Sequence, residues 1–269
     1  MKLQSKLFTS YLIVGLISLI VIGVYANTYL KEEQFLSISE FFMAQLVHLD
    51  FTLSNFLKDV EYDVESLATN RIVRTRDDRH FTNFLHADEQ TFVYNMGEVE
   101  QQIIDVFANY KDHHFYANSV YMGRENGTFV RSHKRTRFTK YDPRIRPWYT
   151  LAVNHPDSVM RTVPYKSVTT DDINIGTVKA LVDDQNTVFG VVGIDITLRG
   201  LTTVVSQIKI RKDSYIFLID EQGIVLSHPD PEKQFKRYDQ EGLHGFQDVM
   251  QNESGRRKPL LKNTTCYAR

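Results

Sequence analysis

The chain opens with a long apolar run over residues 7–26, interrupted only by Thr9, Ser10 and Ser18. As an α-helix, a run of this length spans the roughly 30 Å hydrocarbon core of a membrane. The run therefore predicts an uncleaved transmembrane helix. A cleaved secretory signal with a weak cleavage site at residues 24–26 is the alternative, although the apolar segments of such signals are typically only about 7–15 residues long.

A second pattern covers residues 27–70, where apolar side chains recur at steps of three and four. The stripe comprises Phe35, Ile38, Phe42, Leu46, Leu49, Leu53, Phe56, Val60, Val64 and Leu67. This spacing predicts one long amphipathic stalk helix, which would be roughly 60 Å long. Its stripe can pack on the domain that follows, pair with a second copy in a homodimer, or do both, because the spacing is close to the 3.5-residue repeat of paired helices.

Beyond the stalk the pattern predicts a connector, a second helix and then strands. Residues 71–80 are dense in charge and predict a solvated connector, and an apolar stripe predicts an amphipathic helix over about residues 88–110. Alternating β-forming residues at 115–122 and 128–131 flank a Glu-Asn-Gly turn, which predicts a β-hairpin. After a short helix at residues 148–154, three more strands are predicted, at residues 161–168, 175–182 and 188–197. Antiparallel strands after helices predict an α+β fold.

Composition narrows the class of protein. The 269 residues are 42% hydrophobic and 24% charged, with a formal net charge of −1, so the overall charge does not indicate a nucleic-acid partner. The single cysteine, Cys266, cannot form an internal disulfide. Lys2 and Lys6 precede the apolar run without a nearby acid. This predicts that residues 1–6 are cytoplasmic and that the chain after about residue 27 lies outside the inner or plasma membrane.

One short stretch carries unusual chemistry. Residues 141–149 hold the first two prolines of the chain and its only tryptophan. Each proline disfavours a helical conformation at the residue before it, so Asp142 and Arg146 should be extended and a helix can begin only afterwards. Arg146 then stands close to Trp148 and Tyr149 in a rigid turn. A guanidinium fork beside two aromatic rings suits a carboxylate, and an aromatic loop that closes the core is the alternative.

A single acid interrupts the hydrophobic run of the last predicted strand. Asp195 lies in the segment Val-Val-Gly-Ile-Asp-Ile, which otherwise predicts burial. A buried carboxylate is costly unless a positive group or several donors satisfy it. Its partner is either the ammonium of a ligand or a side chain of the protein, with Arg146 as the candidate for a structural salt bridge.

The order of several polar and aromatic residues resembles the signature of a sensor family. These residues are Tyr121, Arg146, Trp148, Tyr149, Pro164, Tyr165 and Asp195. Their order and separation are similar to the amino-acid-binding signature of double Cache (dCache_1) domains, the extracytoplasmic sensors of bacterial chemoreceptors, sensor histidine kinases and diguanylate cyclases. The resemblance implies a membrane-distal PAS-like module over residues 71–198, a connecting helix at residues 199–212, and part of a membrane-proximal PAS-like module over residues 213–255.

The resemblance also implies roles in a ligand site built by Tyr121, Arg146, Trp148, Tyr149, Tyr165 and Asp195. Arg146 and Trp148 would hold the α-carboxylate of an amino acid, with Tyr149 close by. Asp195 would bind the α-ammonium, and the other two tyrosines would supply hydroxyls and ring faces. One position departs from some amine-sensing relatives, which place another carboxylate where this chain has Ser167. The site would then bind the ammonium more weakly, or the ligand class would be different.

The end of the chain departs further from the family. Residues 256–269 form an atypical tail with neither strand alternation nor an apolar span. We therefore expect a truncated or frame-shifted product whose proximal module lacks strands and which carries no cytoplasmic output domain.

Other candidate sites are weaker. No metal site is predicted from the histidines, because no pair has helical i,i+4 spacing and no cysteine is near His113, His114, His133 or His155. A basic run is better explained as a lid over an anion-accepting pocket than as a nucleic-acid surface: Arg131, Lys134, Arg135, Arg137, Lys140 and Arg144. No motif indicates catalysis or a cofactor.

Taken together, the patterns predict a membrane-anchored amino-acid sensor for transmembrane signalling or chemotaxis. The alternatives are a structural or assembly module with the same fold and no ligand, and a sensor of another small amine or carboxylate.

Overall fold

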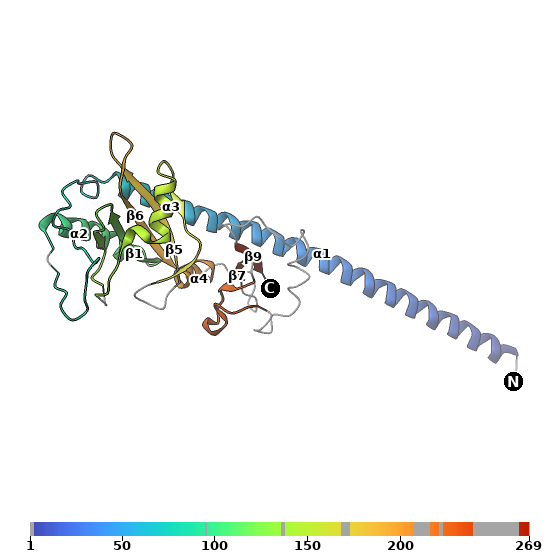
Figure 1. Ribbon diagram of the computed structural model, residues 1–269. Helices are drawn as coiled ribbons and strands as arrows, with labels where there is room; N and C mark the ends of the chain where they lie inside the picture. Colours follow the sequence, from blue (N-terminus) through green and yellow to red (C-terminus); the bar gives the residue numbers. More distant parts are fainter. Residues whose placement is uncertain are drawn as a thin grey trace. The chain divides into compact units, whose positions relative to one another are not determined.

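The structure is a computed structural model that describes residues 3–94, 96–135, 138–167, 173–206, 216–220, 223–238 and 264–268. The chain divides into two compact units, residues 1–48 and 49–269. The first unit contains the N-terminal part of helix α1 (Leu3–Thr69), and the second contains the rest of α1 and all other elements (Figure 1).

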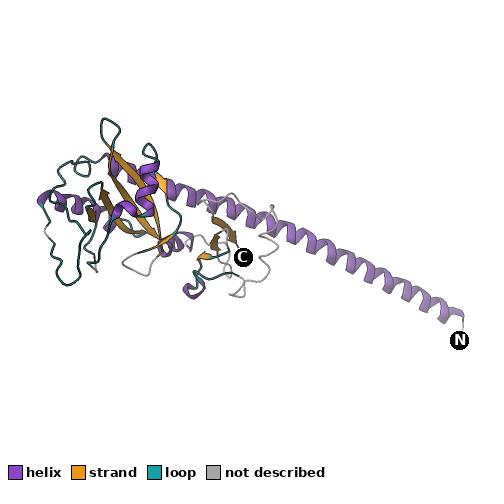
Figure 2. Ribbon diagram, in the orientation of Figure 1, coloured by secondary structure: helices purple, strands orange, loops and turns teal. Residues whose placement is uncertain are grey.

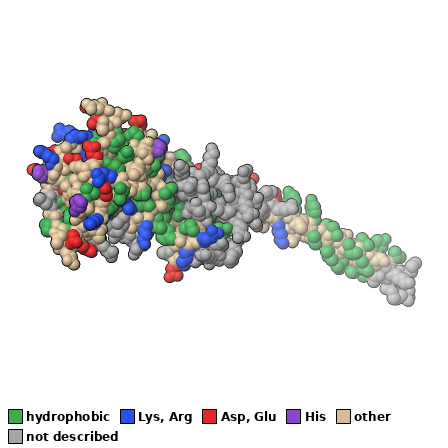
Figure 3. Space-filling view, viewed as in Figure 1, with side chains coloured by type: hydrophobic (Ala, Val, Ile, Leu, Met, Phe, Trp, Pro, Cys, Tyr) green, Lys and Arg blue, Asp and Glu red, His purple; other side chains and the backbone are tan. Residues whose placement is uncertain are grey.

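The first unit carries the predicted membrane segment. Within it, Ser10–Lys31 is long and apolar enough to cross a membrane by length and composition, with a mean hydropathy of 2.0 and none of its apolar window buried. Figure 3 shows hydrophobic side chains gathered along this part of α1. An exposed apolar surface of this kind is stable in the hydrocarbon core of a membrane. This holds both for an uncleaved anchor and for a secretory signal.

The second unit is built on a six-stranded antiparallel sheet (Figure 2). Its central order is β2-β1-β6-β5-β3, and β4 also pairs with β5. The strands are β1 (Ala117–Arg124), β2 (Phe129–Arg131), β3 (Met160–Arg161), β4 (Tyr165–Lys166), β5 (Ile173–Val182) and β6 (Val188–Thr197). The predicted hairpin and the two long strands are confirmed within two residues at each end.

The strand predicted at residues 161–168 is instead two short strands, β3 and β4. Pro164 lies between them. Because proline has no N–H to donate to a ladder, the pairing with β5 is interrupted at this point.

Helices α1 and α2 (Glu98–His113) cover one face of the sheet, which we call the helical face. There Val60 and Val64 of α1 and Phe107 of α2 belong to one buried cluster with strand residues such as Val120 and Ile194. The α1 stripe is buried at Leu49, Leu53, Val60, Val64 and Leu67. Packing of the stripe on its own domain is therefore confirmed for residues 49–67.

Helix α2 begins about ten residues later than predicted. Gly97 is its N-cap, and residues 88–92 form turns. Phe92, counted in the predicted stripe, instead stacks on Phe84 and Phe138, with ring centroids 5.0 and 5.3 Å away. An aromatic cluster on the other face of the sheet thus draws this segment out of the helix.

The opposite face, which we call the cavity face, is covered by the proline-rich turn and helix α3 (Pro147–Asn154). Asp142 and Arg146 are both extended, as predicted, and a short 3-10 helix η1 (Pro143–Ile145) lies between them. The Asp142 carboxylate accepts the N–H of Arg144 at 3.0 Å and so stabilises the start of η1. Helix α3 packs on β5 and β6.

The C-terminal part contains α4 (Leu198–Ser206) and a second, three-stranded sheet with order β8-β7-β9. Helix α4 covers residues 199–206 of the predicted connecting helix, and residues 207–215 lie outside the described residues. The sheet contains β7 (Ile216–Asp220), β8 (Val225–Ser227) and β9 (Thr264–Ala268), and the 3-10 helix η2 (Pro231–Lys233) follows β8.

Strand β9 corrects the prediction for the tail. It pairs antiparallel with β7, from Ile216 opposite Ala268 to Asp220 opposite Thr264. The segment contains two β-branched threonines and a tyrosine, which favour a strand once a partner edge is present. The expectation that residues 256–269 contain no strand is therefore wrong for residues 264–268.

Candidate ligand-binding site

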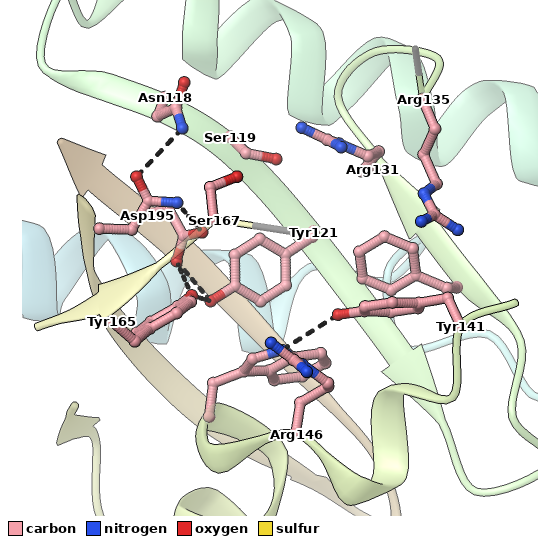
Figure 4. A pocket seen from close by; sticks show the side chains of 13 residues that line it. Asn118, Ser119, Tyr121, Arg131, Arg135, Tyr141, Arg146, Tyr165, Ser167 and Asp195 are labelled. Atoms are coloured by element: carbon pink, nitrogen blue, oxygen red, sulfur yellow. Dashed lines mark hydrogen bonds between the residues drawn. The ribbon is translucent and has the colours of Figure 1, made fainter. Parts of the chain in front are cut away.

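A cavity of about 50 Å³ lies on the cavity face, between the sheet and the turn that leads into α3 (Figure 4). Its volume is several times the roughly 10–15 Å³ that admits a single water molecule. It is lined by Asn118, Ser119, Tyr121, Phe129, Arg131, Arg135, Tyr141, Arg146, Trp148, Tyr165, Ser167, Asn174 and Asp195. The structure thus brings five of the six sequence-predicted site residues to one cavity; the exception is Tyr149.

Asp195 is held by neutral donors. Its Oδ1 accepts hydrogen bonds from the hydroxyls of Tyr121 at 2.7 Å and Tyr165 at 2.6 Å, and its Oδ2 accepts one from the Asn174 amide at 3.0 Å. Among the described residues, no ion pair joins Asp195 to Arg146. The salt bridge considered from the sequence is therefore not formed, and both charges face the cavity.

The strand register and a glycine create this arrangement. Asp195 on β6 lies opposite Ser119 on β1 and opposite Gly176 on β5. A Cβ atom at Gly176 would stand 3.1 Å from the Tyr121 hydroxyl oxygen and 3.2 Å from the Oδ1 of Asp195. Glycine at this position therefore leaves the hydrogen bond between Tyr121 and Asp195 undisturbed. A glycine inside a strand often marks such a close approach of neighbouring groups.

Arg146 stands at the N-cap of α3, where its carbonyl accepts the N–H groups of Tyr149 and Thr150. These bonds fix the backbone from which its side chain reaches the cavity. The Arg146 Nε is buried without a hydrogen-bond partner among the described residues, and the guanidinium carbon lies 5.9 Å from the centre of the Tyr141 ring. Arg146 can therefore take an incoming acceptor without breaking an existing hydrogen bond.

Trp148 is buried and joins the two ends of the site. Its indole Nε1 donates to the Tyr141 hydroxyl at 3.3 Å, and its ring meets that of Tyr121 edge to face with centroids 4.8 Å apart. Because the indole N–H is already used, the Tyr141 hydroxyl presents its hydrogen to the cavity in place of the indole.

Tyr149 does not line the cavity. It is 6% exposed and packs edge to face on Trp148 with centroids 5.5 Å apart. Burial, aided by the charge of Glu125, raises the pKa of Tyr149 to about 12. Tyr149 therefore positions the Trp148 ring by packing against it.

Sequence patterns did not single out several lining residues, notably Asn118, Ser119, Tyr141 and Asn174. Their signal lies in register: Ser119 is the strand partner of Asp195, and Asn174 lies two residues before Gly176, on the same face of β5. Ser167, the position at which the chain departs from some amine sensors, also lines the cavity. Among the described residues, no group of three or more His, Cys, Asp or Glu side chains comes together to hold a metal.

Burial sets the protonation of Asp195. It raises the pKa of this carboxyl to about 6, against the hydrogen bonds from Tyr165, Tyr121 and Asn174 and the charge of Arg131, which lower it. The carboxylate is therefore charged at pH 7, and its burial destabilises the fold.

This shift predicts a pH dependence of stability. The folded state holds the Asp195 proton more tightly than the unfolded chain, whose carboxyl has the ordinary pKa of 3.8. As the pH rises from about 4 to about 6, the unfolded state loses its proton first, and the fold loses on the order of 3 kcal/mol of stability. Denaturant unfolding of the full chain and of Asp195→Asn at several pH values measures this. The difference between the two proteins should change over that interval, and a constant difference would refute the shift.

Comparison with known proteins places these observations in a family. A profile of the Cache domain (dCache_1) matches residues 37–268. The methyl-accepting chemotaxis protein McpC of Bacillus subtilis (strain 168) is 34% identical over 132 residues, which are 49% of this chain and 20% of that protein. The chain thus spans about a fifth of the length of this relative.

Solved structures share the fold. The ligand-binding domain of the Pseudomonas fluorescens chemoreceptor CtaA in complex with L-serine superimposes with a TM-score of 0.54 at 20% identity, covering 76% of this chain and 78% of that chain. For the ligand-binding domain of the Pseudomonas aeruginosa PAO1 amino acid chemoreceptor PctC in complex with GABA, the TM-score is 0.51 at 21% identity, with coverages of 73% and 78%. Because the family profile covers most of the sequence, the chain belongs to the double Cache (dCache_1) family of sensor domains.

Proposed function

We propose that the chain is a membrane-anchored, extracytoplasmic sensor domain that binds an amino acid for transmembrane signalling in chemotaxis. One observation carries the proposal. Arg146 and Asp195 line the same cavity without pairing with each other. Two opposite charges kept apart across a cavity are complementary to a zwitterion, in which a carboxylate and an ammonium are held apart by one carbon.

In this proposal the carboxylate end of the ligand meets Arg146 and the Tyr141 hydroxyl. The arginine contributes charge-assisted hydrogen bonds, and Trp148 holds the tyrosine in place through its indole N–H. The ammonium end meets Asp195, which Tyr121 and Tyr165 keep oriented through their hydroxyls. The aromatic rings exclude water, which strengthens both interactions.

A signal needs a route from the cavity to the long helix, and Arg161 supplies one. This residue of β3 donates to the backbone carbonyl of Leu57 on α1 at 3.2 Å and forms an ion pair with Glu61 at 2.5 Å. Its neighbour Thr162 accepts the N–H of Gly176 through its hydroxyl at 2.9 Å, next to Asp195. Closure of the cavity around a ligand would shift β3 and with it the contact on α1, provided that the two states differ in affinity for the ligand.

The anchor and its orientation belong to the same proposal. Residues 7–26 would cross the membrane once, with residues 1–6 inside and the chain after about residue 27 outside, in agreement with the positions of Lys2 and Lys6. The part of the α1 stripe before residue 49 would pair with a second copy to form a homodimer.

A melting experiment tests ligand binding directly. The full chain, purified in detergent micelles, is heated with each of the twenty amino acids and with simple amines and carboxylates. A ligand present at one hundred times its dissociation constant should add about 2.7 kcal/mol to the free energy of unfolding, so at least one amino acid should raise the melting temperature. If no compound does, the fold serves as a structural or assembly module. A response confined to amines or to carboxylates would make it a sensor of another class.

A further inference from the structure

A second cavity, of about 170 Å³, lies at the edge of the six-stranded sheet, between β2 and α2. Glu100 and Ile104 of α2 line one side of it, and Lys134, which follows β2, lines another. Its volume is close to the roughly 150 Å³ of an engineered apolar cavity that binds benzene. The space is therefore large enough for a small ring or a short branched chain.

Glu100 brings a buried carboxylate to this cavity. Its side chain is 1% exposed, and its Oε2 accepts the backbone N–H of Thr82 at 2.9 Å. Among the described residues, no lysine, arginine or histidine forms an ion pair with Glu100. Burial raises the pKa of Glu100, whereas hydrogen bonding from Thr82 lowers it. The carboxylate is therefore held by a neutral donor, without the counter-ion that a buried charge ordinarily has.

Aromatic rings form much of the remaining wall. Phe84, Tyr94 and Phe129 line the cavity, and the first two meet edge to face with centroids 5.9 Å apart. The ammonium of Lys134 lies 5.4 Å from the centre of the Tyr94 ring. Because the face of an aromatic ring attracts a cation within about 6 Å, this wall suits an ammonium group. A carboxylate beside aromatic faces is complementary to an organic cation.

Two positive side chains line the same cavity and are compatible with such a ligand. Lys134 is exposed, so solvent screens its charge, and its flexible stem lets the ammonium leave the ring. Arg131 also lines the first cavity, where the charge of Asp195 acts on its guanidinium. Neither forms an ion pair with Glu100.

We propose that this cavity is a second ligand site, which binds a small organic ammonium whose apolar body is about the size of benzene. Glu100 accepts the N–H groups of the ammonium, and the rings of Phe84, Tyr94 and Phe129 enclose the apolar body. The site is distinct from the proposed amino-acid site, in which Asp195 meets the ammonium. It therefore adds a second class of ligand to the proposed function.

A matched pair of probes isolates the charge of the ligand. Isothermal titration calorimetry of the full chain in detergent micelles at pH 7 compares benzylammonium with benzyl alcohol, which has nearly the same shape and no charge. Titrations into micelles without protein are subtracted. The ammonium should bind at least about tenfold more tightly, because it forms charge-assisted hydrogen bonds with Glu100. If the alcohol binds as tightly, or if neither probe binds, the proposal is wrong.

Matched variants of α2 locate the effect. Glu100→Gln removes the charge and keeps an acceptor for the Thr82 N–H, so it should weaken benzylammonium binding by at least about tenfold. Glu98→Gln is the control, because Glu98 is an exposed acid in the first turn of the same helix and does not line the cavity. Equal losses in the two variants, or no loss in Glu100→Gln, overturn the proposal.

Two further variants complete the test. Ile104→Trp fills the cavity from the α2 side without changing its charge and should also weaken benzylammonium binding by at least about tenfold, which decides the matter if Glu100→Gln does not fold. If Asp195→Asn weakens this binding as much as Glu100→Gln does, the ammonium lies in the first cavity and the second site is wrong. The amino-acid sensor is then unaffected, because the melting panel tests it separately.

Discussion

Replacing Arg146 with alanine should weaken amino-acid binding by at least about a hundredfold, because the ligand carboxylate would lose the charge-assisted hydrogen bonds of the arginine fork. The fold should survive. The guanidinium forms no ion pair among the described residues, its Nε is buried without a partner, and the extended backbone at this position suits alanine. Titration calorimetry measures the affinity, and denaturant unfolding should show a stability within about 1 kcal/mol of the original.

Arg144→Ala is the matched control for this variant. Arg144 is an exposed arginine of the same turn, and its guanidinium pairs with Asp142 at 2.8 Å outside the cavity. Its removal should change affinity by less than about threefold, as for a solvent-exposed ion pair. If Arg144→Ala weakens binding as strongly as Arg146→Ala, the turn acts through its overall shape and Arg146 is no carboxylate ligand.

Replacing Asp195 with asparagine should abolish binding without unfolding the protein. Loss of the charge that meets the ligand ammonium should cost at least about a hundredfold in affinity. The asparagine oxygen can still accept the hydroxyl protons of Tyr121 and Tyr165. At pH 7 the removal of the buried charge offsets the loss of the second oxygen, which accepts from the Asn174 amide. Stability at pH 7 should therefore be unchanged or higher while calorimetry detects no binding.

Normal binding by the Asp195→Asn variant would contradict the proposed role of the Asp195 charge. If Asp195→Asn binds amino acids normally, the carboxylate is a structural acceptor for the two tyrosines and not the ammonium partner. Asp195→Ala provides the comparison, because it leaves two buried hydroxyls without their acceptor and should destabilise the fold by about 1–3 kcal/mol per unsatisfied group. Loss of stability in the alanine variant alone separates the hydrogen-bonding role of Asp195 from its charge.

The sequence predicted elements best where a strong local pattern had no competing contact. The stalk stripe from Leu49 to Leu67, the Asn-Gly hairpin and the extended residues before the two prolines all follow from local rules. The start of α2 did not, because Phe92 contributes more by stacking on other aromatic rings than by extending a helical stripe. Strand β9 did not either, because it depends on pairing with β7, which is distant in sequence.

For the site, too, local sequence patterns predicted some features, whereas contacts between distant residues decided others. A signature of residue types in order was sufficient to bring Tyr121, Arg146, Tyr165 and Asp195 into view. It could not show that Asp195 is satisfied by neutral donors and not by an arginine, since this depends on strand register and on the space left at Gly176. It also placed Tyr149 in the site, whereas the helical turn of α3 directs this side chain behind Trp148.

A thermodynamic cycle between protein and ligand tests whether Arg146 meets the α-carboxylate of the amino acid. Calorimetry would compare the amino acid that gives the largest shift in the melting panel with its α-amide, each against the original chain and Arg146→Ala. If Arg146 meets the α-carboxylate, amidation should weaken binding to the original chain by at least about tenfold and should cost little more once the arginine is gone. Equal losses on amidation in both proteins would show that the carboxylate lies elsewhere, and the proposed placement of a zwitterion between Arg146 and Asp195 would be wrong.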